Sequence, residues 1–299
     1  MKKIDIHVHT AKYCYDNAVP VKYGADRPFA NPKELIEMYR PIEVVKAVIL
    51  PIVSPECSFQ VSNEGAYAAF KAHPDTFEWF CCLDPRNGAN SEKTDFSGLL
   101  EHYKTLGAKG VGELTSNMRF DGSLTRNLFF HCQNAGLPVL FHISPKEGAN
   151  YGLIDELGLP GLEAALKEFP RLNFIGHSQP FWAEMSADLT EEKRNTYPSG
   201  KVTGGRIAEL LSRYPNLYCD MSAGSGANAF MRDPEYAYRF IERFADRLLY
   251  GTDICDTGNT HQNIFNVWLE KSHNEKCISR TNYEKICYKN ASKLLSVKV

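Results

Sequence analysis

The chain has 299 residues, of which 43% are hydrophobic and 23% are charged, with 34 Lys and Arg residues against 36 Asp and Glu residues. A formal net charge of −2 excludes the basic field that nucleic acids and anionic membrane surfaces attract. No apolar run is longer than a strand or a short helix, so the sequence predicts a cytoplasmic protein without membrane or nucleic-acid partners. The nine cysteines are scattered without a Cys-x-x-Cys pair, which argues against disulfides.

Eight short runs rich in β-branched and aromatic residues recur along the chain, each followed by a turn and a longer helical pattern. They are spaced by roughly 35 residues, the size of a βα unit. The sequence therefore predicts an α/β fold, a single (β/α)8 TIM barrel that forms one domain over residues 1–299. The predicted strands are Lys3–His9, Val45–Ile52, Phe77–Leu83, Lys109–Leu114, Pro138–His142, Leu172–His177, Asn216–Ser222 and Arg247–Thr252.

The segments between these runs fit amphipathic helices. Asn31 precedes a proline and a helical pattern, which is typical of an N-cap. Ser123–Ala135 begins at a residue suited to an N-cap and ends before Gly136. Two long polar segments, Thr10–Phe29 and Phe181–Thr203, are predicted as inserted loops over the barrel mouth. Further helices are predicted over Pro160–Phe169, Gly204–Tyr214 and Pro234–Phe244.

His7 and His9 stand two residues apart in the first predicted strand. A strand's period of two places both on one face together with Asp5, and the isoleucines and valine between them on the face toward the helices. An inward-facing Asp-x-His-x-His needs a partner for its ring nitrogens, and a divalent metal ion is the simplest one. Two hydrogen-bonded core histidines are the alternative, and an isolated His-x-His would favour it.

Other predicted strands also end in an acid or an imidazole: Glu113 in VGEL, His142 in LFH, His177 in FIGH and Asp253 in YGTD. The carboxyl ends of barrel strands meet at one mouth, so these side chains would gather with the first-strand histidines. Four imidazoles and two carboxylates suit zinc, manganese or iron better than calcium or magnesium. The remaining histidines, predicted at the surface, are His73, His102, His131, His261 and His273.

The ordered set IDIHVH, VGEL, VLFH, FIGH and YGTD resembles the amidohydrolase superfamily. It is most similar to the branch that includes aminocarboxymuconate semialdehyde decarboxylase, aromatic-acid decarboxylases and lactonases, as is the closing NASKLL of residues 290–295. The resemblance spans nearly the whole chain. It implies a metal-dependent enzyme with one or two divalent transition-metal ions, zinc first and manganese or iron as alternatives. Enzymes of this branch are often dimers, so it also allows a homodimer.

The resemblance implies that His7, His9 and Asp253 bind one ion, with His142 a ligand of the same ion or of a second one. His177 is then either a ligand of the second ion or an unligated catalytic group. Glu113 resembles the bridging ligand of two-metal members such as the TatD-like deoxyribonucleases, although many decarboxylases of the branch lack it. Its alternative role is to accept a hydrogen bond from an imidazole N–H.

A site of this kind makes water a nucleophile at neutral pH. Asp253 is expected to be the general acid and base, and His177 to stabilise negative charge on the substrate carbonyl. The predicted reaction is hydrolysis of a C–N or C–O bond in an amide or lactone of a small metabolite. A non-oxidative decarboxylase acting on an aromatic or dienoic acid is the alternative, and a metal-loaded barrel without turnover is a third. Intact Asp253 and His177 argue against the third.

The substrate is expected to carry a carboxylate or to be a cyclic ester or amide. Arg86 directly follows the third strand and is the preferred clamp for a substrate carboxylate, ahead of Arg27 and Arg119, with a surface position as the alternative for each. Trp182 is expected either to cover a small planar substrate or to anchor the inserted loop against the barrel. The segment Ser222–Asn228, SAGSGAN, is similar to loops that bind phosphate through backbone N–H groups.

Overall fold

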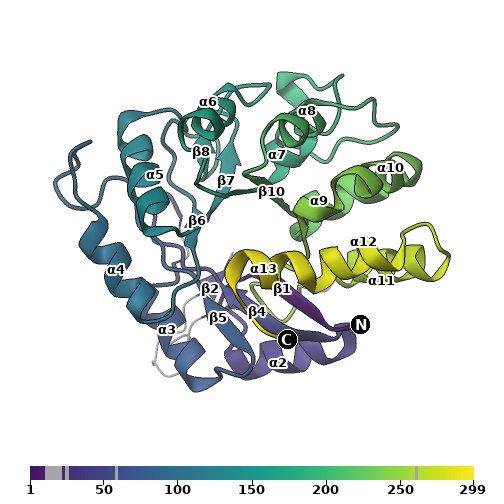
Figure 1. Cartoon of the computed structure of the whole chain (residues 1–299), viewed down its shortest axis with the longest axis horizontal. Coiled ribbons are helices and arrows are strands. Elements are labelled where there is room, and N and C mark those ends of the chain that lie inside the picture. Colours follow the sequence, from purple (N-terminus) through teal and green to yellow (C-terminus); the bar gives the residue numbers. More distant parts are fainter. Residues whose placement is uncertain (11–21, 24–26, 58–59, 260–261) are drawn as a thin grey trace.

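The computed structural model describes residues 1–10, 22–23, 27–57, 60–259 and 262–299. In this part of the chain, parallel strands form a ring that is surrounded by helices (Figure 1). All eight predicted strands are present, and their order along the chain is their order around the ring. They are β1 (Lys3–Val8), β4 (Val44–Ile49), β5 (Phe77–Trp79), β6 (Val111–Leu114), β7 (Val139–Ser144), β9 (Phe174–His177), β10 (Leu217–Asp220) and β11 (Leu248–Leu249).

The ring consists of two sheets that meet at two seams. One sheet contains β1, β4 and β5, and the other contains β6, β7, β9, β10 and β11. A parallel bridge between Cys81 and Val111 joins β5 to β6, and another between Val8 and Ile254 joins β1 to the segment after β11. Backbone hydrogen bonds cross both seams. The predicted (β/α)8 barrel is therefore confirmed.

The helices lie outside the ring (Figure 1), and those predicted from the sequence are found at their expected places. Asn31 caps its helix through a capping box with Glu34, with N–H to oxygen distances of 3.0 and 2.8 Å. The helix at Ser123 is capped by Gly122 instead, one residue earlier than expected. The helices are α2 (Pro32–Tyr39), α3 (Asn63–Ala72), α4 (Ser97–Thr105), α5 (Ser123–Ala135), α6 (Pro160–Glu168), α7 (Gln179–Ala183), α8 (Arg206–Arg213), α9 (Ala223–Met231), α10 (Pro234–Phe244), α11 (Gln262–Asn274), α12 (Arg280–Glu284) and α13 (Asn290–Leu295). Short strands outside the ring are β2 (Lys22–Tyr23), β3 (Arg27–Pro28) and β8 (Leu153–Ile154).

An apolar cluster fills the inside of the ring. It gathers residues from six barrel strands or from the position just after them, and these residues can only meet at the centre. The strand contribution consists of Ile4, Ile6, Val48, Leu50, Phe80, Leu140, Ile175 and Leu249. A larger apolar layer packs between the outer face of the ring and the helices. The interior is therefore a packed core and not a pore, as expected for eight strands.

A β-bulge in β1 turns the histidines toward this interior. Asp5 pairs with Ala47 of β4, and Val8 pairs with Ile49, so β1 has one more residue than its partner over this interval. The extra residue shifts the alternation of side chains by one position. His7 therefore faces inward, although the preceding isoleucine does so too.

The prediction that Asp5 shares the inward face while Ile4 and Ile6 point toward the helices is wrong. Both isoleucines belong to the interior cluster. Asp5 accepts hydrogen bonds from the hydroxyl of Tyr39 in α2 and from the backbone N–H of Thr252, each at 2.9 Å. The prediction assumed an unbroken period of two, which the bulge interrupts.

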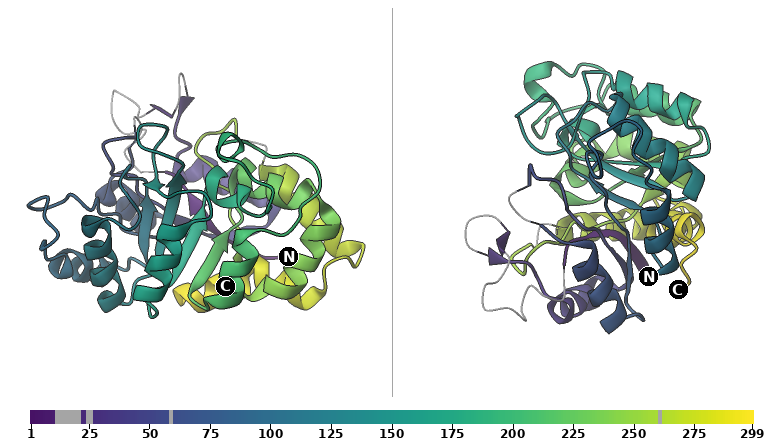
Figure 2. Two further views of the ribbon diagram at one scale, coloured as in Figure 1. Left: turned by 90° about the horizontal axis from the view of Figure 1, so that it is seen from above. Right: turned by 90° about the vertical axis from the view of Figure 1, so that its left-hand side faces the viewer.

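The amino end of the barrel is closed by α13. Ala291, Leu295 and the following Val297 belong to the interior cluster. Asn290 fixes the start of this helix, because its side-chain N–H donates to the carbonyl of Leu248 at 2.8 Å. Both chain termini lie at this end of the molecule, and the β2–β3 pair lies at the opposite end (Figure 2). The mouth formed by the carboxyl ends of the strands is thus remote from the termini.

The predicted insertion Phe181–Thr203 follows β9 and is held by a buried arginine. Arg194 is fully buried and donates to the carbonyls of Asp155 and Glu156, each at 3.1 Å. Those carbonyls belong to the connection between β7 and α6, so the insertion packs against its neighbour on the mouth side of the barrel. Most of the other predicted insertion, Thr10–Phe29, lies outside the described residues.

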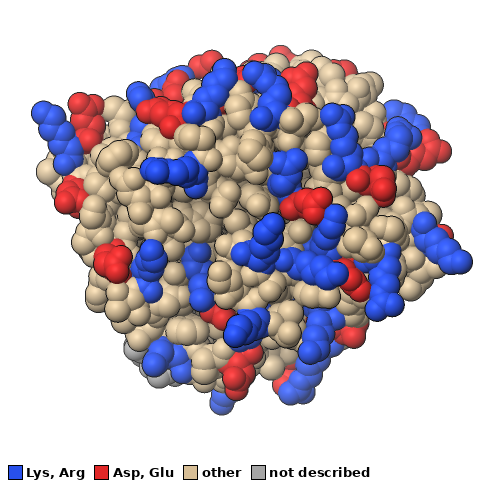
Figure 3. Space-filling model, viewed as in Figure 1, with Lys and Arg blue, Asp and Glu red and all other residues tan. Residues whose placement is uncertain are grey.

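Lysines and arginines are prominent on the face that carries the termini, with acidic side chains set between them (Figure 3). Several are paired: Lys285 lies 2.9 Å from Asp246, and Glu284 accepts from Lys289 at 2.6 Å and from Arg280 at 2.9 Å. Part of the basic charge on this face is therefore neutralised locally.

The described residues also bear on the predictions about disulfides and membrane-spanning segments. Among the described cysteines, Cys57, Cys81, Cys82, Cys132, Cys219, Cys277 and Cys287 carry free thiols. None of the described helices combines the length and the apolar character needed to cross a bilayer.

Candidate metal centre

The predicted site residues lie together at the carboxyl ends of the strands. The structure places in one cluster His7 and His9 from β1 and its end, Glu113 from β6, His142 from β7, His177 from β9 and Asp253 from the segment after β11. All are buried except Asp253, whose side chain is 24% exposed. Residues up to 246 positions apart thus meet at one mouth, as the barrel prediction requires.

Glu113 reaches this cluster through a second bulge, in β6. Val111 pairs with Val139 of β7, and Leu114 pairs with Phe141, so β6 also has one extra residue. The bulge turns the Glu113 side chain toward the interior, where its carboxylate meets the histidines. Both strands that supply the centre of the site are therefore bulged where their ligands project.

Four atoms converge at the centre: Nε2 of His7, Nε2 of His9, Oε2 of Glu113 and Oδ1 of Asp253. The two nitrogens are 3.0 Å apart. Glu113 Oε2 lies 3.5 Å from His7 Nε2 and 3.4 Å from His9 Nε2, and Asp253 Oδ1 lies 3.4 Å from each nitrogen. The ligands of a tetrahedral zinc ion, each about 2.0–2.1 Å from the metal, stand about 3.4 Å from one another. The spacing therefore fits one ion.

The hydrogen bonds of the two rings direct their lone pairs toward this centre. Nδ1 of His9 lies 2.9 Å from the carbonyl oxygen of Leu50, which can only accept, so the ring donates its N–H there. Nδ1 of His7 likewise donates to Oδ2 of Asp220 at 2.6 Å. In a neutral imidazole the other nitrogen is then an acceptor. Two nitrogen lone pairs thus face two carboxylate oxygens, an arrangement that suits a cation.

The charges around the centre lead to the same conclusion. Burial alone would lower the pKa of His7, but the carboxylates of Asp253, Asp220 and Glu113 raise it well above its usual value. The pKa of His9 is raised against burial by hydrogen bonds to Asp253 and Glu113. Burial would raise the pKa values of these two carboxyls, but the nearby imidazoles lower them. The cluster therefore carries negative charge that ring protons or a divalent ion can balance.

A second group of donors lies on the other side of Glu113. Its Oε1 is 2.9 Å from Nδ1 of His142, and Nε2 of His142 is buried without a hydrogen-bond partner among the described residues. His177 completes a set whose ligand atoms all lie within 4.8 Å of one another. Burial lowers the pKa of His142, which favours the neutral form that binds metals. The position of Glu113 is compatible with both of its predicted roles, ion ligand and imidazole acceptor.

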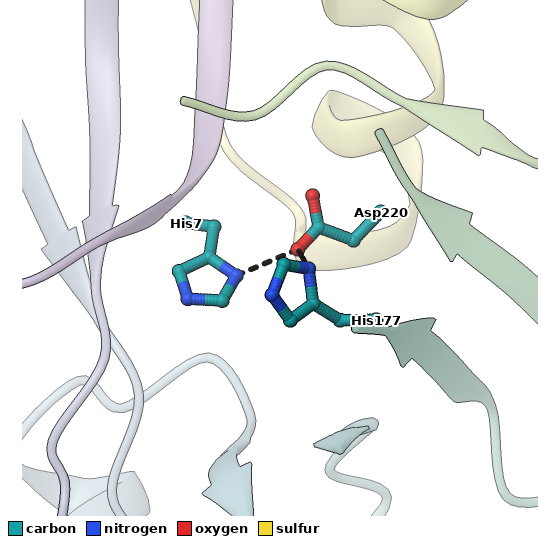
Figure 4. A group of neighbouring side chains, drawn as sticks. All are labelled: His7, His177 and Asp220. Carbon is teal, nitrogen blue, oxygen red and sulfur yellow. Dashed lines mark hydrogen bonds and ion pairs between the residues drawn. The ribbon is translucent and has the colours of Figure 1, made fainter. Parts of the chain in front are cut away.

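Asp220 is part of the site although the sequence analysis did not identify it. It ends β10, is fully buried, and its Oδ2 lies 2.6 Å from His7 Nδ1 and 3.0 Å from His177 Nδ1 (Figure 4). Burial would raise its pKa, but the two imidazoles hold it far below the usual value. The signal was present in the sequence, because LYCD closes an apolar run with an acid just as YGTD does.

Trp182 supports this strand from behind. Its side chain is buried, and its indole N–H donates to the carbonyl of Asp220 at 2.8 Å. Its ring packs edge-on against Phe181 and Phe230. This position does not suit the predicted role of covering a substrate, because the indole is enclosed and its only donor is used. It suits the alternative, an anchor for the inserted segment.

Arg86 is held by two carboxylates of the protein. Its Nε and Nη2 donate to Asp84, each at 2.7 Å, and its Nη1 and Nη2 donate to Glu56 at 2.7 and 2.9 Å. The bidentate geometry that was expected for a substrate carboxylate is thus used within the protein. Asp84 and Glu56 follow neighbouring strands, so Arg86 ties two loops together and does not suit the predicted substrate clamp.

The other predicted contacts lie elsewhere. Arg119 is exposed and paired with Asp121 and Glu156 at 2.9 and 3.2 Å. The side chain of Arg27 lies outside the described residues, as does His261. The SAGSGAN segment forms the start of α9. Of the histidines predicted at the surface, His73, His102, His131 and His273 are described and lie outside the ligand groups. The prediction is wrong for His131, whose side chain is only 12% exposed because it packs against α4.

The fold and the cluster together define a class: a (β/α)8 barrel with a candidate site for a divalent metal ion at the carboxyl ends of its strands. The family model described as amidohydrolase matches residues 4–297, so the chain belongs to the amidohydrolase family. The resemblance seen in the sequence is thereby confirmed. A comparison with curated proteins gives no match.

Solved structures with the same fold cover the whole chain. A probable 2-pyrone-4,6-dicarboxylic acid hydrolase from Acinetobacter baumannii, with citric acid bound, is 15% identical over 99% of this chain and 100% of that chain, with a TM-score of 0.61. A 2,6-dihydroxybenzoate decarboxylase from Rhizobium is 14% identical over 99% of each chain, with a TM-score of 0.60. An amidohydrolase from Burkholderia multivorans is 12% identical over 100% of each chain, with a TM-score of 0.65. At these identities the likeness shows the fold alone.

Proposed function

We propose that residues 1–299 form one metal-dependent hydrolase domain that cleaves a C–O or C–N bond in a lactone or amide of a small carboxylate-bearing molecule. The observation that carries the proposal is the convergence of His7 Nε2, His9 Nε2, Glu113 Oε2 and Asp253 Oδ1 within 3.0–3.5 Å over the five measured pairs. The name of the Acinetobacter baumannii protein, a hydrolase of a cyclic dicarboxylic acid, supports the same substrate class.

The four converging groups would hold the ion, with zinc as the first expectation and manganese or iron as alternatives. When bound, the ion supplies Lewis-acid chemistry, which polarises a substrate oxygen and makes water easier to deprotonate. Glu113 and His142 would hold a second ion if one binds, because His142 Nε2 is buried without a partner among the described residues.

Asp253 is the group that would move the proton. One of its oxygens faces His7 and His9, while the other lies 3.9 Å from Nε2 of His177, and its side chain is the one site side chain with clear exposure to the mouth. The imidazoles lower its pKa against the effect of burial, so it is a carboxylate at neutral pH and can accept a proton from water. The same carboxyl can then deliver that proton to the leaving group.

His177 would stabilise the charge that develops on the substrate. Its Nδ1 lies 3.0 Å from Asp220 Oδ2 and 3.1 Å from the Ser222 hydroxyl, so its Nε2 points toward the space beside Asp253. In its protonated form the ring would donate a hydrogen bond to an oxygen of the substrate there. An acid beside the leaving group and a donor beside the oxygen are what hydrolysis of a lactone or amide requires.

The test uses the intact protein purified without chelator. Elemental analysis is expected to find one or two equivalents of a transition metal per chain. A panel of lactones, cyclic amides and aromatic acids is then assayed with separate detection of released acid and of carbon dioxide. Acid release without carbon dioxide supports the hydrolase, whereas carbon dioxide from an aromatic acid identifies the decarboxylase instead. An active protein that contains no metal would overturn the proposal.

Asp253→Asn provides the matching variant. It keeps the shape of the side chain but removes the proton acceptor, so turnover should fall by at least about 100-fold with the fold intact. Asp246→Asn is the control, because Asp246 is exposed and pairs with Lys285 at the surface, away from the site. A normal rate in Asp253→Asn would remove Asp253 from the proposed role.

A further inference from the structure

One carboxylate oxygen serves two rings of the site. Asp220 Oδ2 lies 2.6 Å from Nδ1 of His7 and 3.0 Å from Nδ1 of His177, and the two ring centroids are only 4.5 Å apart (Figure 4). The two rings belong to β1 and β9, two strands that are remote from each other in sequence. The carboxylate therefore connects a proposed metal ligand to the proposed oxyanion stabiliser.

Asp220 is itself held on every side. The backbone N–H of Ser222 donates to Oδ1 at 2.9 Å, and the hydroxyl of Ser222 donates to Oδ2 at 2.8 Å. Trp182 donates to the main-chain carbonyl of Asp220. Behind the carboxylate, a Cβ at Gly251 would stand 2.6 Å from Oδ1, so the space is closed to any larger residue. The fully buried carboxylate thus has one well-defined position.

This position favours a hydrogen on Nδ1 of each ring. A carboxylate only accepts, so His7 presents Nδ1–H to Asp220. Nδ1 of His177 lies 3.0 Å from the same Asp220 oxygen and 3.1 Å from the Ser222 hydroxyl, so both rings turn Nε2 away from Asp220. Nε2 of His7 then lies 3.0 Å from Nε2 of His9, and Nε2 of His177 lies 3.9 Å from Asp253 Oδ2. Both Nε2 atoms therefore face the centre where metal and substrate would meet.

The other two histidines of the site are held differently. Nδ1 of His9 donates to the backbone carbonyl of Leu50, and Nδ1 of His142 lies beside Glu113 Oε1. Among the four site histidines, only His7 and His177 have Nδ1 atoms beside the same carboxylate oxygen. A change at Asp220 would therefore disturb the Nδ1 contacts of a metal ligand and of a reacting group together.

We propose that Asp220 is a positioning residue that holds His7 and His177 as one unit, so that both rings present Nε2 to the metal and substrate. The proposal rests on the function proposed above, which makes His7 a metal ligand and His177 the group that stabilises charge on the substrate. It assigns Asp220 no contact with substrate. Asparagine cannot replace it. The two oxygens of Asp220 accept two ring N–H groups, a backbone N–H and a hydroxyl, and an amide has one oxygen and one donor group in their place.

The experiment combines zinc affinity with nuclear magnetic resonance of the ring nitrogens. Asp220→Asn is expected to weaken Zn²⁺ binding by roughly 10–100-fold, measured by competition with a chromogenic chelator. In ¹⁵N-labelled wild type, His7 and His177 should both show Nδ1–H signals with and without zinc, and Asp220→Asn should lose at least one. His7→Gln and His177→Gln assign the two signals.

Two further variants separate positioning from general damage to the fold. Asp155→Asn changes another buried carboxylate that accepts backbone N–H groups outside the site, and it should leave zinc affinity within about threefold of wild type. Ser222→Ala removes a donor to Asp220 and also the hydroxyl oxygen 3.1 Å from His177 Nδ1, so it tests whether Asp220 alone holds that ring. Both Nδ1–H signals should persist.

The outcomes distinguish this proposal from the proposed function. Wild-type protein that binds no zinc, manganese or iron would overturn the function, while its ring signals would still test Asp220. Wild-type protein with Nε2–H instead of Nδ1–H on either ring would overturn the role of Asp220. So would an Asp220→Asn variant with unchanged zinc affinity and both ring signals intact.

Discussion

Two clusters of charged residues are buried on the mouth side of this barrel, and they are neutralised in different ways. In one cluster, the guanidinium of Arg194 lies 3.7 Å from the Glu184 carboxylate, and burial raises the pKa of the nearby Asp155 while the charge of Arg194 opposes this rise. At the centre of the site, Glu113 Oε2 and Asp253 Oδ1 each lie 3.4–3.5 Å from imidazole nitrogens. The first cluster contains its own cation, while the second has the geometry and charge to receive one.

The difference separates a structural cluster from a functional one. Where a resident cation is present, the neighbouring backbone carbonyls also bond to it and the cluster ties two loops together. At the centre of the site, two imidazole nitrogens and two carboxylate oxygens stand at the mutual distances of metal ligands. Buried charge alone therefore does not identify the site. What identifies it is that carboxylate oxygens and imidazole nitrogens point toward one common centre.

The largest contrast is expected from removal of one converging donor. His9→Gln should lose the ion and, with it, turnover, and zinc affinity should fall by more than the roughly 100-fold that loss of an outer partner costs. His131→Gln is the matched control, since His131 is mostly buried but lies outside the site. Metal content by elemental analysis and Zn²⁺ competition measure the effect, and normal affinity in His9→Gln would contradict the assignment.

Removing the resident cation should act on stability instead. Arg194→Met leaves Asp155 and Glu184 buried without their cation, so the free energy of unfolding should fall by about 3–5 kcal/mol while zinc affinity is preserved. Arg119→Met is the control, because that arginine is 56% exposed and should cost at most about 1 kcal/mol. Denaturant titration gives both values. A loss of zinc binding in folded Arg194→Met would erase the distinction between the clusters.

The free energy of unfolding should also depend on pH through Asp155, which lies near Arg194. Burial raises the pKa of Asp155 from 3.8 to about 6 against the opposing effect of its N–H donors. The folded state then holds this proton more tightly, so the associated stabilisation is complete below about pH 4 and is lost as the pH rises through about 6. The change amounts to about 3 kcal/mol. Asp155→Asn should flatten this part of the stability profile, and an unchanged slope would show that another group titrates.

The smallest effect is expected behind Asp220. Gly251→Ala places a Cβ 2.6 Å from Asp220 Oδ1 and 2.8 Å from Ser222 Cβ, which should destabilise the fold by about 1–3 kcal/mol. Gly98→Ala in α4 has open space and should stabilise by about 0.5–1 kcal/mol. Thermal unfolding compares the two. If Gly251→Ala were as stable as wild type, the close packing behind Asp220 would be disproved.

The sequence was sufficient for the barrel and for the six gathered side chains, because both depend on where apolar runs end. Nearly continuous apolar strands at regular spacing predict a parallel ring, and a ring brings the residues that close those runs to one mouth. Glu113, His142, His177 and Asp253 were found by that rule. Asp220 satisfies the same rule and could have been found with them.

Other features depended on information that the pattern does not contain. The bulges in β1 and β6 are differences in count between paired strands, and a single strand does not reveal them. The partners of Arg86 and the burial of Trp182 arise from packing between loops. An arginine after a strand end reads the same whether it binds a substrate or, as here, two carboxylates of the chain.

The bond from His9 to the carbonyl of Leu50 bears on how the site could be redesigned. The acceptor is a main-chain atom, so any apolar residue at position 50 preserves the orientation of His9 as long as the barrel core stays filled. The orientation of His7 depends on one particular side chain, that of Asp220. Mutation of its acceptor can therefore change the orientation of His7, whereas mutation at position 50 does not remove the acceptor of His9. Directed evolution of metal preference can use the first contact and not the second.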